Sequence, residues 1–460
     1  MAQCKIVFVS VPKISPDTPP AGPAVLKAYL LKNNIQSTYL DWNRDFYDVC
    51  KERQYWSFGT VEGNLLQNDE FDRIWKINYS WIKEYFKTNI PITCKYIGLS
   101  LFSFESAYAA EKLSVFFKKH FPDKKIVIGG PGSNTVSKKF LEDNLIDYSI
   151  PGDGEEALVK LLNNESHPGI NNYYIDKKLS MDDIPVGNFD DLNLSRYNGG
   201  IYIRTSKGCV LNCSFCDVKS LWSKFQFQSP SKIVEDLKII RDKYPEVKDV
   251  KFADSLLNGS MSKFRELLTL MAAEKFPMNF ETKIIIRPSK QMPEEDYKLM
   301  ADANFKVVLP GVESGSESVR QHMGKMFSND DLIFFMNNMQ KYNLKAVFLF
   351  IIGYITETEE DFQETLDLIT LINTKYADVV PTIAMGEQLF ILPGSPLSDK
   401  HFDFDVFDHT YWEINGNTKT VREDRNARLI EHTNNMNINT VCRKASEGNT
   451  VLKYKGDQSL

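Results

Sequence analysis

Three cysteines close together near the middle of the chain have the types and spacing that chemistry needs. Cys209, Cys213 and Cys216 lie in the string RTSKGCVLNCSFCDV, directly after a predicted strand. Three thiolates with three and then two residues between them can bind one face of an iron–sulfur cubane and leave the fourth iron open to a small molecule. A structural zinc site normally has four ligands, and the next Cys or His is His322. The alternative is therefore a zinc site that a distant residue closes.

The composition limits the class of protein. The chain has 460 residues and seven cysteines, an odd count that does not suit a secreted disulfide framework. The formal net charge of −6 does not suggest nucleic acid as a partner. The longest apolar run, residues 346–355, is too short for a membrane helix, and no signal segment begins the sequence. We expect a cytoplasmic protein with no membrane or nucleic-acid partner.

Strands and helices alternate along the first third of the chain. Short β-branched runs predict strands at residues 5–10, 35–40, 96–101, 125–128 and 146–150. Helical patterns separate most of them, which predicts a Rossmann-like, doubly wound parallel sheet over residues 1–165. Residues 42–87 are an aromatic-rich insertion, and Trp56, Trp75 and Trp81 there are expected to pack in the core, as is Trp412 in the tail.

A second series of strands and helices follows a polar linker at residues 166–198. Strands are expected at residues 201–205, 249–253, 279–284, 306–309, 346–352 and 387–392, with helices between them. Six strand–helix units predict an α/β architecture of the partial (β/α)6 TIM-type barrel kind over residues 199–400. The cysteine loop then lies at the carboxyl ends of the strands, where barrel active sites form. Residues 401–460 are expected to be a C-terminal extension.

The cysteine string, with Phe215 before its last cysteine, resembles the CxxxCxxC motif of the radical S-adenosylmethionine (SAM) superfamily. In that family SAM chelates the open iron through its amino and carboxylate groups. Four later segments, in the same order and each after a predicted strand, resemble the family's SAM-binding segments. They are Phe252-Ala253-Asp254 with Asn258, GVESGSESVRQHMGK, IIGYITETEEDFQET and LPGSPL. The resemblance implies that a 4Fe–4S cluster is bound by Cys209, Cys213 and Cys216. It also implies SAM contacts from Phe215, Asp254, Asn258, Arg287, Glu313, Ser314, Gly353, Glu357 and Thr358.

The first third resembles the cobalamin-binding domain that precedes the barrel in many radical SAM enzymes. The segments that carry this resemblance are PPAGPAVLKAYL, IGLSLFSFESAYAAEKL, KIVIGGPGSN and IDYSIPGDGEEAL. In an open α/β sheet a ligand lies beyond the carboxyl ends of the strands, which here end in loops containing Ser103, Gly129, Gly130, Pro131, Gly152 and Glu155. The Asp-x-His-x-x-Gly motif that ligates cobalt in mutases has no match, as in many radical SAM relatives. Tight turns without a ligand are the alternative.

Cys4, Cys50 and Cys94 raise a rival, because methylthiotransferases carry a second cluster on three cysteines of the N-terminal domain. Cys4 and Cys94 each precede a predicted strand and should lie at the amino edge of the sheet, opposite the cofactor loops. We expect them to be structural thiols.

The resemblance implies a radical SAM enzyme that cleaves SAM to a 5′-deoxyadenosyl radical, with cobalamin-dependent methyl transfer to an unactivated carbon as the favoured reaction. A reductant such as flavodoxin or ferredoxin is the implied partner, and the substrate is not identified. No general base or nucleophile stands out, as expected where a radical does the work. One alternative is a rearrangement or cyclisation with an empty N-terminal domain. A more distant one is a zinc-binding interaction protein.

Overall fold

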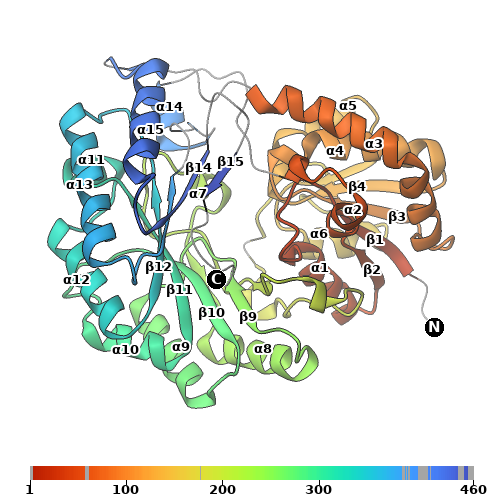
Figure 1. Cartoon of the computed structure of the whole chain (residues 1–460). Helices are drawn as coiled ribbons and strands as arrows, with labels where there is room; N and C mark the ends of the chain where they lie inside the picture. The colour runs from red at the N-terminus through yellow and green to blue at the C-terminus, as the bar shows by residue number, and fades with distance from the viewer. Residues whose placement is uncertain are drawn as a thin grey trace. The chain divides into compact units, whose positions relative to one another are not determined.

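A computed structural model of the chain divides into two compact units, and Figure 1 labels their helices and strands. The first comprises residues 1–57, 64–204 and 242–248, and the second comprises the remaining residues. The structure describes residues 4–56, 62–176, 178–385, 389, 391, 394–401, 413–414, 416–443 and 450–453. No helix among these residues combines the length and apolar character that crossing a bilayer requires.

The first unit is built on a five-stranded parallel sheet with the order β2-β1-β3-β4-β5. This is a doubly wound order in which the strand sequence reverses beside β1, and it confirms the predicted fold class. The strands are β1 (Cys4–Ser10), β2 (Gln36–Leu40), β3 (Tyr96–Ser100), β4 (Lys125–Gly129) and β5 (Tyr148–Ile150). The helices are α1 (Ala21–Lys32), α2 (Trp42–Val49), α3 (Glu62–Asn89), α4 (Ala107–His120), α5 (Ser137–Glu142) and α6 (Glu155–Leu162).

The aromatic-rich insertion packs as core over one face of this sheet. The ring of Trp42 stacks on that of Phe46 at 5.0 Å and meets that of Trp75 edge-on at 6.1 Å. Trp56, Trp75 and Trp81 belong to or pack against the same apolar cluster, as predicted. Trp412 lies outside the described residues. Residues 166–198, predicted as a linker, belong to the first unit.

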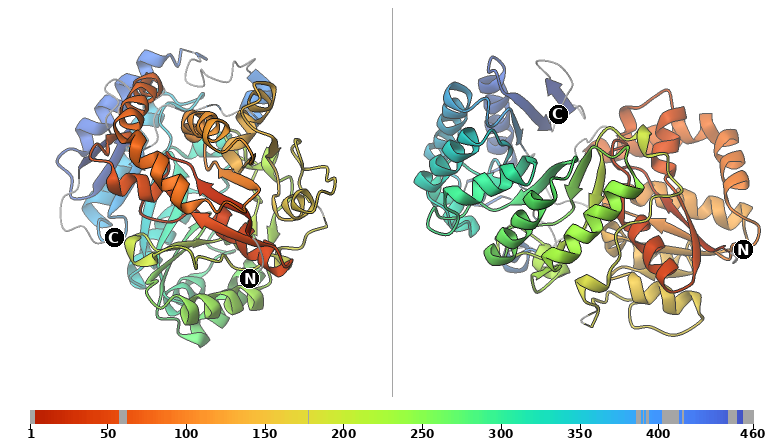
Figure 2. Two further views of the ribbon diagram at one scale, coloured as in Figure 1. Left: turned by 90° about the vertical axis from the view of Figure 1, so that its right-hand side faces the viewer. Right: turned by 90° about the horizontal axis from the view of Figure 1, so that it is seen from below.

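The second unit holds an eight-stranded sheet with the order β15-β14-β13-β12-β11-β10-β9-β6. Neighbours from β9 to β14 are parallel and follow one another in chain order, as in a partial barrel. Figure 2 shows helices along the outside of this sheet. The strands are β6 (Ile201–Ile203), β9 (Asp249–Phe252), β10 (Asn279–Ile284), β11 (Phe305–Glu313), β12 (Lys345–Phe350), β13 (Thr382–Met385), β14 (Asn439–Arg443) and β15 (Thr450–Lys453). A hairpin adds β7 (Ser206–Lys207) and β8 (Gln226–Phe227).

Nine helices are described in this part of the chain, and most lie between successive strands of the sheet, as predicted. They are α7 (Val218–Leu221), α8 (Pro230–Lys243), α9 (Met261–Glu274), α10 (Glu294–Asp302), α11 (Glu317–Met323), α12 (Asn329–Lys341), α13 (Glu359–Lys375), α14 (Pro396–His401) and α15 (Lys419–Thr433). The sixth strand of the prediction, at residues 387–392, is displaced: β13 ends at Met385, and most of the predicted range lies outside the described residues. The predicted extension supplies α15 and two strands to this unit.

Candidate functional site

The cysteine loop follows β7 and is held by two neighbouring elements of the second unit. The backbone N–H of Ser214 donates to the carbonyl of Met323 at the end of α11, at 3.0 Å. Its carbonyl accepts from the N–H of Leu397 at the start of α14, at 2.8 Å. The loop is therefore fastened through its backbone to both α11 and α14.

The three cysteines of this loop all lie among the described residues. In that part of the chain, no three Cys, His, Asp or Glu side chains form a group that could hold a metal ion. In a cubane each of three thiolates binds a different iron. The N–H of Leu211 already points at Cys209 Sγ, at 3.4 Å. Burial raises the pKa of Cys213 to about 11. Because a thiol must be deprotonated to bind a metal, binding there would release a proton.

Two cations flank the cysteine loop. The ammonium of Lys325 is buried, donates to Glu313 Oε1 at 2.9 Å and Gly311 O at 3.1 Å, and lies 5.9 Å from the ring centre of Phe215. Burial alone would lower the pKa of Lys325, but Glu313 and Cys213 raise it above its ordinary value. Burial lowers the pKa of Arg287, and the Cys209 thiolate opposes this effect. Both cations favour thiolate ligands.

Asp254 and Asn258 follow β9, but their polar atoms are engaged by neighbouring loops. Asp254 is 1% exposed and accepts from the N–H groups of Thr205 and Ser206, both at 2.8 Å. Asn258 is fully buried and exchanges two hydrogen bonds with the backbone of Ile285, at 2.9 and 3.0 Å. Asp254 anchors the strand that leads into the cysteine loop, and Asn258 joins the loops after β9 and β10. Their predicted contacts with SAM stay predictions.

Glu313 and Ser314 form the turn at the end of β11. Glu313 has a φ of +69°, a conformation that L-residues rarely adopt. Ser314 is fully buried, its hydroxyl accepts from the N–H of Ser316 at 3.1 Å, and its carbonyl accepts from Arg320 at 2.8 Å. Glu313 thus faces Lys325 beside the cysteines, whereas Ser314 shapes the turn. Lys325 was not among the predicted site residues, because its pairing with Glu313 depends on this unusual backbone conformation.

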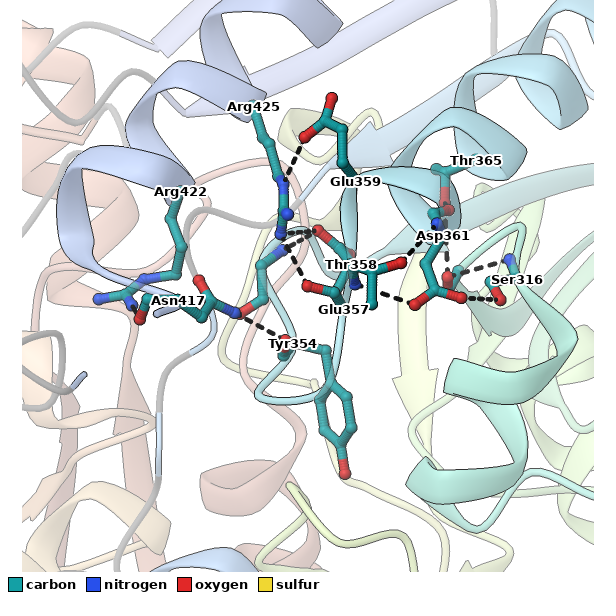
Figure 3. A network of polar contacts seen from close by, with 12 residues as sticks. Ser316, Tyr354, Glu357, Thr358, Glu359, Asp361, Thr365, Asn417, Arg422 and Arg425 are labelled. Carbon is teal, nitrogen blue, oxygen red and sulfur yellow. Dashed lines mark hydrogen bonds and ion pairs between the residues drawn. The ribbon is translucent and has the colours of Figure 1, made fainter. Parts of the chain in front are cut away.

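Gly353, Glu357 and Thr358 form the loop between β12 and α13. Glu357 Oε1 accepts from the N–H of Gly353 at 3.0 Å and from Arg425 at 3.0 Å (Figure 3). Thr358 caps α13 in a reciprocal arrangement with Asp361. Burial raises the pKa of Glu357 to about 7, against the effect of Arg425. Its Oε2 is buried without a hydrogen-bond partner among the described residues.

In the first unit, two of the predicted loop glycines lie directly against backbone atoms of neighbouring loops. Gly130 has a φ of +97°, and a Cβ there would lie 2.3 Å from Leu101 O. A Cβ on Gly152 would lie 1.9 Å from Tyr174 O. Both glycines are therefore required by the packing of loops within the unit.

The other predicted residues of these loops lie at the carboxyl ends of β3, β4 and β5. Gly129 ends β4, and Pro131 starts the turn that follows it. Ser103 Oγ is buried and has no hydrogen-bond partner among the described residues, as expected of a group that a ligand satisfies. Glu155 begins α6 and pairs with Arg204 at 2.5 Å.

Cys4 and Cys94 lie together at the amino ends of β1 and β3, the edge of the sheet that sequence reasoning assigned to them. The neighbouring Cys94 thiol is the main cause that lowers the pKa of Cys4 to about 6. Cys50 ends α2 and donates its thiol hydrogen to Glu52 O at 3.2 Å. The first two thiols are thus at the opposite edge from Ser103 and the other loops at the carboxyl ends of the strands.

Comparison with known protein families gives a match to one part of the chain. Residues 203–369 match the Radical SAM superfamily, and this range contains the cysteine loop and every SAM-side segment described above except the last. Residues 203–369 form a radical SAM domain. An uncharacterized methyltransferase of Pyrococcus horikoshii is 24% identical over 203 residues, which cover 43% of each chain. The chain thus spans less than half the length of that relative.

Solved structures share the fold beyond the radical SAM domain. The cobalamin-dependent SAM radical enzyme OxsB, solved with aqua-cobalamin and SAM, matches with a TM-score of 0.68 at 15% identity, over 94% of this chain and 67% of that one. The radical SAM methyltransferase TsrM of Kitasatospora setae, solved with cobalamin and a [4Fe–4S] cluster, matches with a TM-score of 0.62 at 16% identity, over 86% and 74% of the two chains. Both comparisons cover most of the first unit as well.

Proposed function

We propose that this chain is a radical SAM enzyme that uses cobalamin to transfer a methyl group to an unactivated carbon. The observation that carries the proposal is the radical SAM domain, whose cysteine loop lies between Arg287 and the buried Lys325–Glu313 pair. The fold shared with OxsB and TsrM supports the cobalamin part. A substrate and a low-potential electron carrier complete the reaction.

Each group of residues has a task in this proposal. When bound, the cluster and cobalamin supply electron transfer to SAM, formation of a 5′-deoxyadenosyl radical and a carrier for the methyl group. Cys209, Cys213 and Cys216 hold the cluster, and Lys325 places a positive charge beside it. Ser103 offers a buried hydroxyl to the ligand of the first unit.

A second candidate is a radical rearrangement or cyclisation with an empty first unit. The packing of Gly130 and Gly152 favours it, because these glycines are explained by backbone contacts without any ligand. Incubation of the full chain with hydroxocobalamin, followed by desalting and a visible spectrum, separates the two. One retained equivalent supports the methyl-transfer proposal, and none overturns its cobalamin part.

The cluster is tested by Cys213→Ala against Cys94→Ala, a second buried cysteine, in anaerobically reconstituted protein. We expect Cys213→Ala to lose the brown colour and at least about nine-tenths of SAM cleavage, since one iron loses its ligand. Cys94→Ala should keep both. Full iron and sulfide content in Cys213→Ala would refute the assignment, and one equivalent of zinc without sulfide would favour a zinc-binding protein. Mass spectrometry of a host extract then seeks a product in which methyl replaces hydrogen.

A further inference from the structure

The C-terminal helix α15 reaches the loop that joins β12 to α13. Arg425 and Glu357 have side chains only 6% and 0% exposed, and their atoms Nη1 and Oε1 lie 3.0 Å apart. Arg425 Nη1 also donates to the carbonyl of Glu357, at 3.1 Å. Figure 3 shows the arginine pointing from α15 into this loop. A residue from the predicted extension therefore neutralises a carboxylate inside the radical SAM domain.

The start of the loop between β12 and α13 contacts Asn417, which precedes α15, and Arg422 of α15. Asn417 Nδ2 donates to the carbonyls of Gly353 and Tyr354, at 3.1 and 2.8 Å. Gly353 has a φ of +76°, and a Cβ there would lie 2.4 Å from Arg422 Cγ. The side chain of Arg422 thus covers the glycine directly, and the loop is fastened to residues 417–425 at both ends.

The contact extends from this loop to the turn after β11. Glu357 leads into Thr358, which caps α13, and Asp361 of that cap accepts hydrogen bonds from Ser316 at 2.5 Å and Ser318 at 2.9 Å (Figure 3). Without Arg425, Glu357 Oε1 and the Glu357 carbonyl would each lose a buried hydrogen-bond donor, which weakens the closed conformation of the loop. The shape of two SAM-side segments then depends on α15.

We infer that Arg425 and Asn417 are positioning residues for SAM, which makes residues 417–425 part of the SAM site. They hold residues 353–358 in the conformation that SAM meets, while the cysteine loop binds the cluster without them. The inference rests on the proposed function, because it takes SAM to be the ligand of this loop.

The test compares Arg425→Gln with Arg428→Gln in the full chain. Arg428 is the matched control. It lies three residues further along α15 and pairs with Glu359, but its side chain is 40% exposed. In cluster-loaded protein, we expect Arg425→Gln to weaken SAM binding about tenfold by equilibrium dialysis, with iron content unchanged. Arg428→Gln should change affinity less than about twofold, as a surface pair does. Arg425→Lys should recover part of the loss.

Hydrogen–deuterium exchange of the apoprotein gives a readout that needs no cofactor. Amides of residues 353–358 should exchange faster in Arg425→Gln than in the wild type or in Arg428→Gln. If Arg425→Gln does not fold, Asn417→Ala takes its place with the same expected pattern. Unchanged SAM affinity in the variant overturns the inference, whether or not exchange changes. Wild-type protein that holds its cluster but does not bind SAM would instead refute the proposed function.

Discussion

Asp254 carries its carboxylate into the interior of the second unit, where two backbone amides donate to it. Burial raises the pKa of Asp254 to about 6, although the donors from Thr205 and Ser206 lower it. The native state therefore keeps a proton on Asp254 at a pH where the unfolded chain, with its ordinary pKa near 4, has lost it. The free energy of unfolding must then depend on pH.

Between pH about 4 and 6 the native state binds more protons at Asp254 than the unfolded state does, so this residue's contribution to stability falls as the pH rises. A difference of about two pKa units corresponds to about 3 kcal/mol over that window. Asp254→Asn should lose this part of the pH dependence, as followed by urea unfolding of the apoprotein at pH 4.5 and 7. Asp302→Asn, at a carboxylate whose side chain is 48% exposed, should keep the wild-type dependence. If the free energy of unfolding of Asp254→Asn depended on pH as in the wild type, the raised pKa of Asp254 would be contradicted.

Single residues also show where sequence reasoning stops. The cysteine loop could be singled out from the sequence because its three cysteines are close together and lie in one loop. The pairs Lys325–Glu313 and Arg425–Glu357 could not, because their partners are 12 and 68 residues apart and meet only through a turn with positive φ or a helix from another part of the chain. Nothing in the local string marks such a partner.

At the scale of elements, the turn after β4 depends on one glycine. Gly130→Ala should lower the free energy of unfolding of the first unit by at least about 2 kcal/mol, because its Cβ would meet Leu101 O and its φ is unfavourable for alanine. Gly22→Ala in α1 has no atom within 4 Å of the new Cβ and should be neutral or raise stability by up to about 1 kcal/mol. Thermal unfolding of both variants followed by fluorescence checks the difference. Equal midpoints would contradict it.

The strands that could be predicted are those with continuous apolar, β-branched runs. In the first unit, β1 with the sequence CKIVFVS and β4 with KIVIG are of this kind. β14 reads NTVCR and lies in a polar tail, so the sequence alone suggested an extension there. Its place is set by pairing: Ile383 of β13 lies opposite Thr440 in parallel register. Tertiary pairing, rather than local pattern, makes this segment a strand.

At the scale of the whole molecule, the proposed function assigns a different ligand to each of the two units. Loading the full chain with iron and sulfide should slow hydrogen–deuterium exchange in residues 206–217 about tenfold or more and leave residues 101–106 and 129–135 unchanged. Hydroxocobalamin should slow exchange in residues 101–106 and 129–135 and leave residues 206–217 unchanged, because each ligand stabilises the loops that it contacts. Hydroxocobalamin that slows exchange only in residues 206–217 would contradict the assignment of cobalamin to the first unit.

The aromatic insertion gives the chain a built-in spectroscopic label. The whole chain has six tryptophans. Four of them belong to or pack against one apolar cluster of the first unit: Trp42, Trp56, Trp75 and Trp81. Emission from the native chain is therefore dominated by indoles in an apolar setting, and its red shift on denaturation reports the melting of that unit. Far-UV circular dichroism, by contrast, samples the helices of both units. Recording the two signals on one sample shows whether the halves of this molecule lose their structure together or in turn.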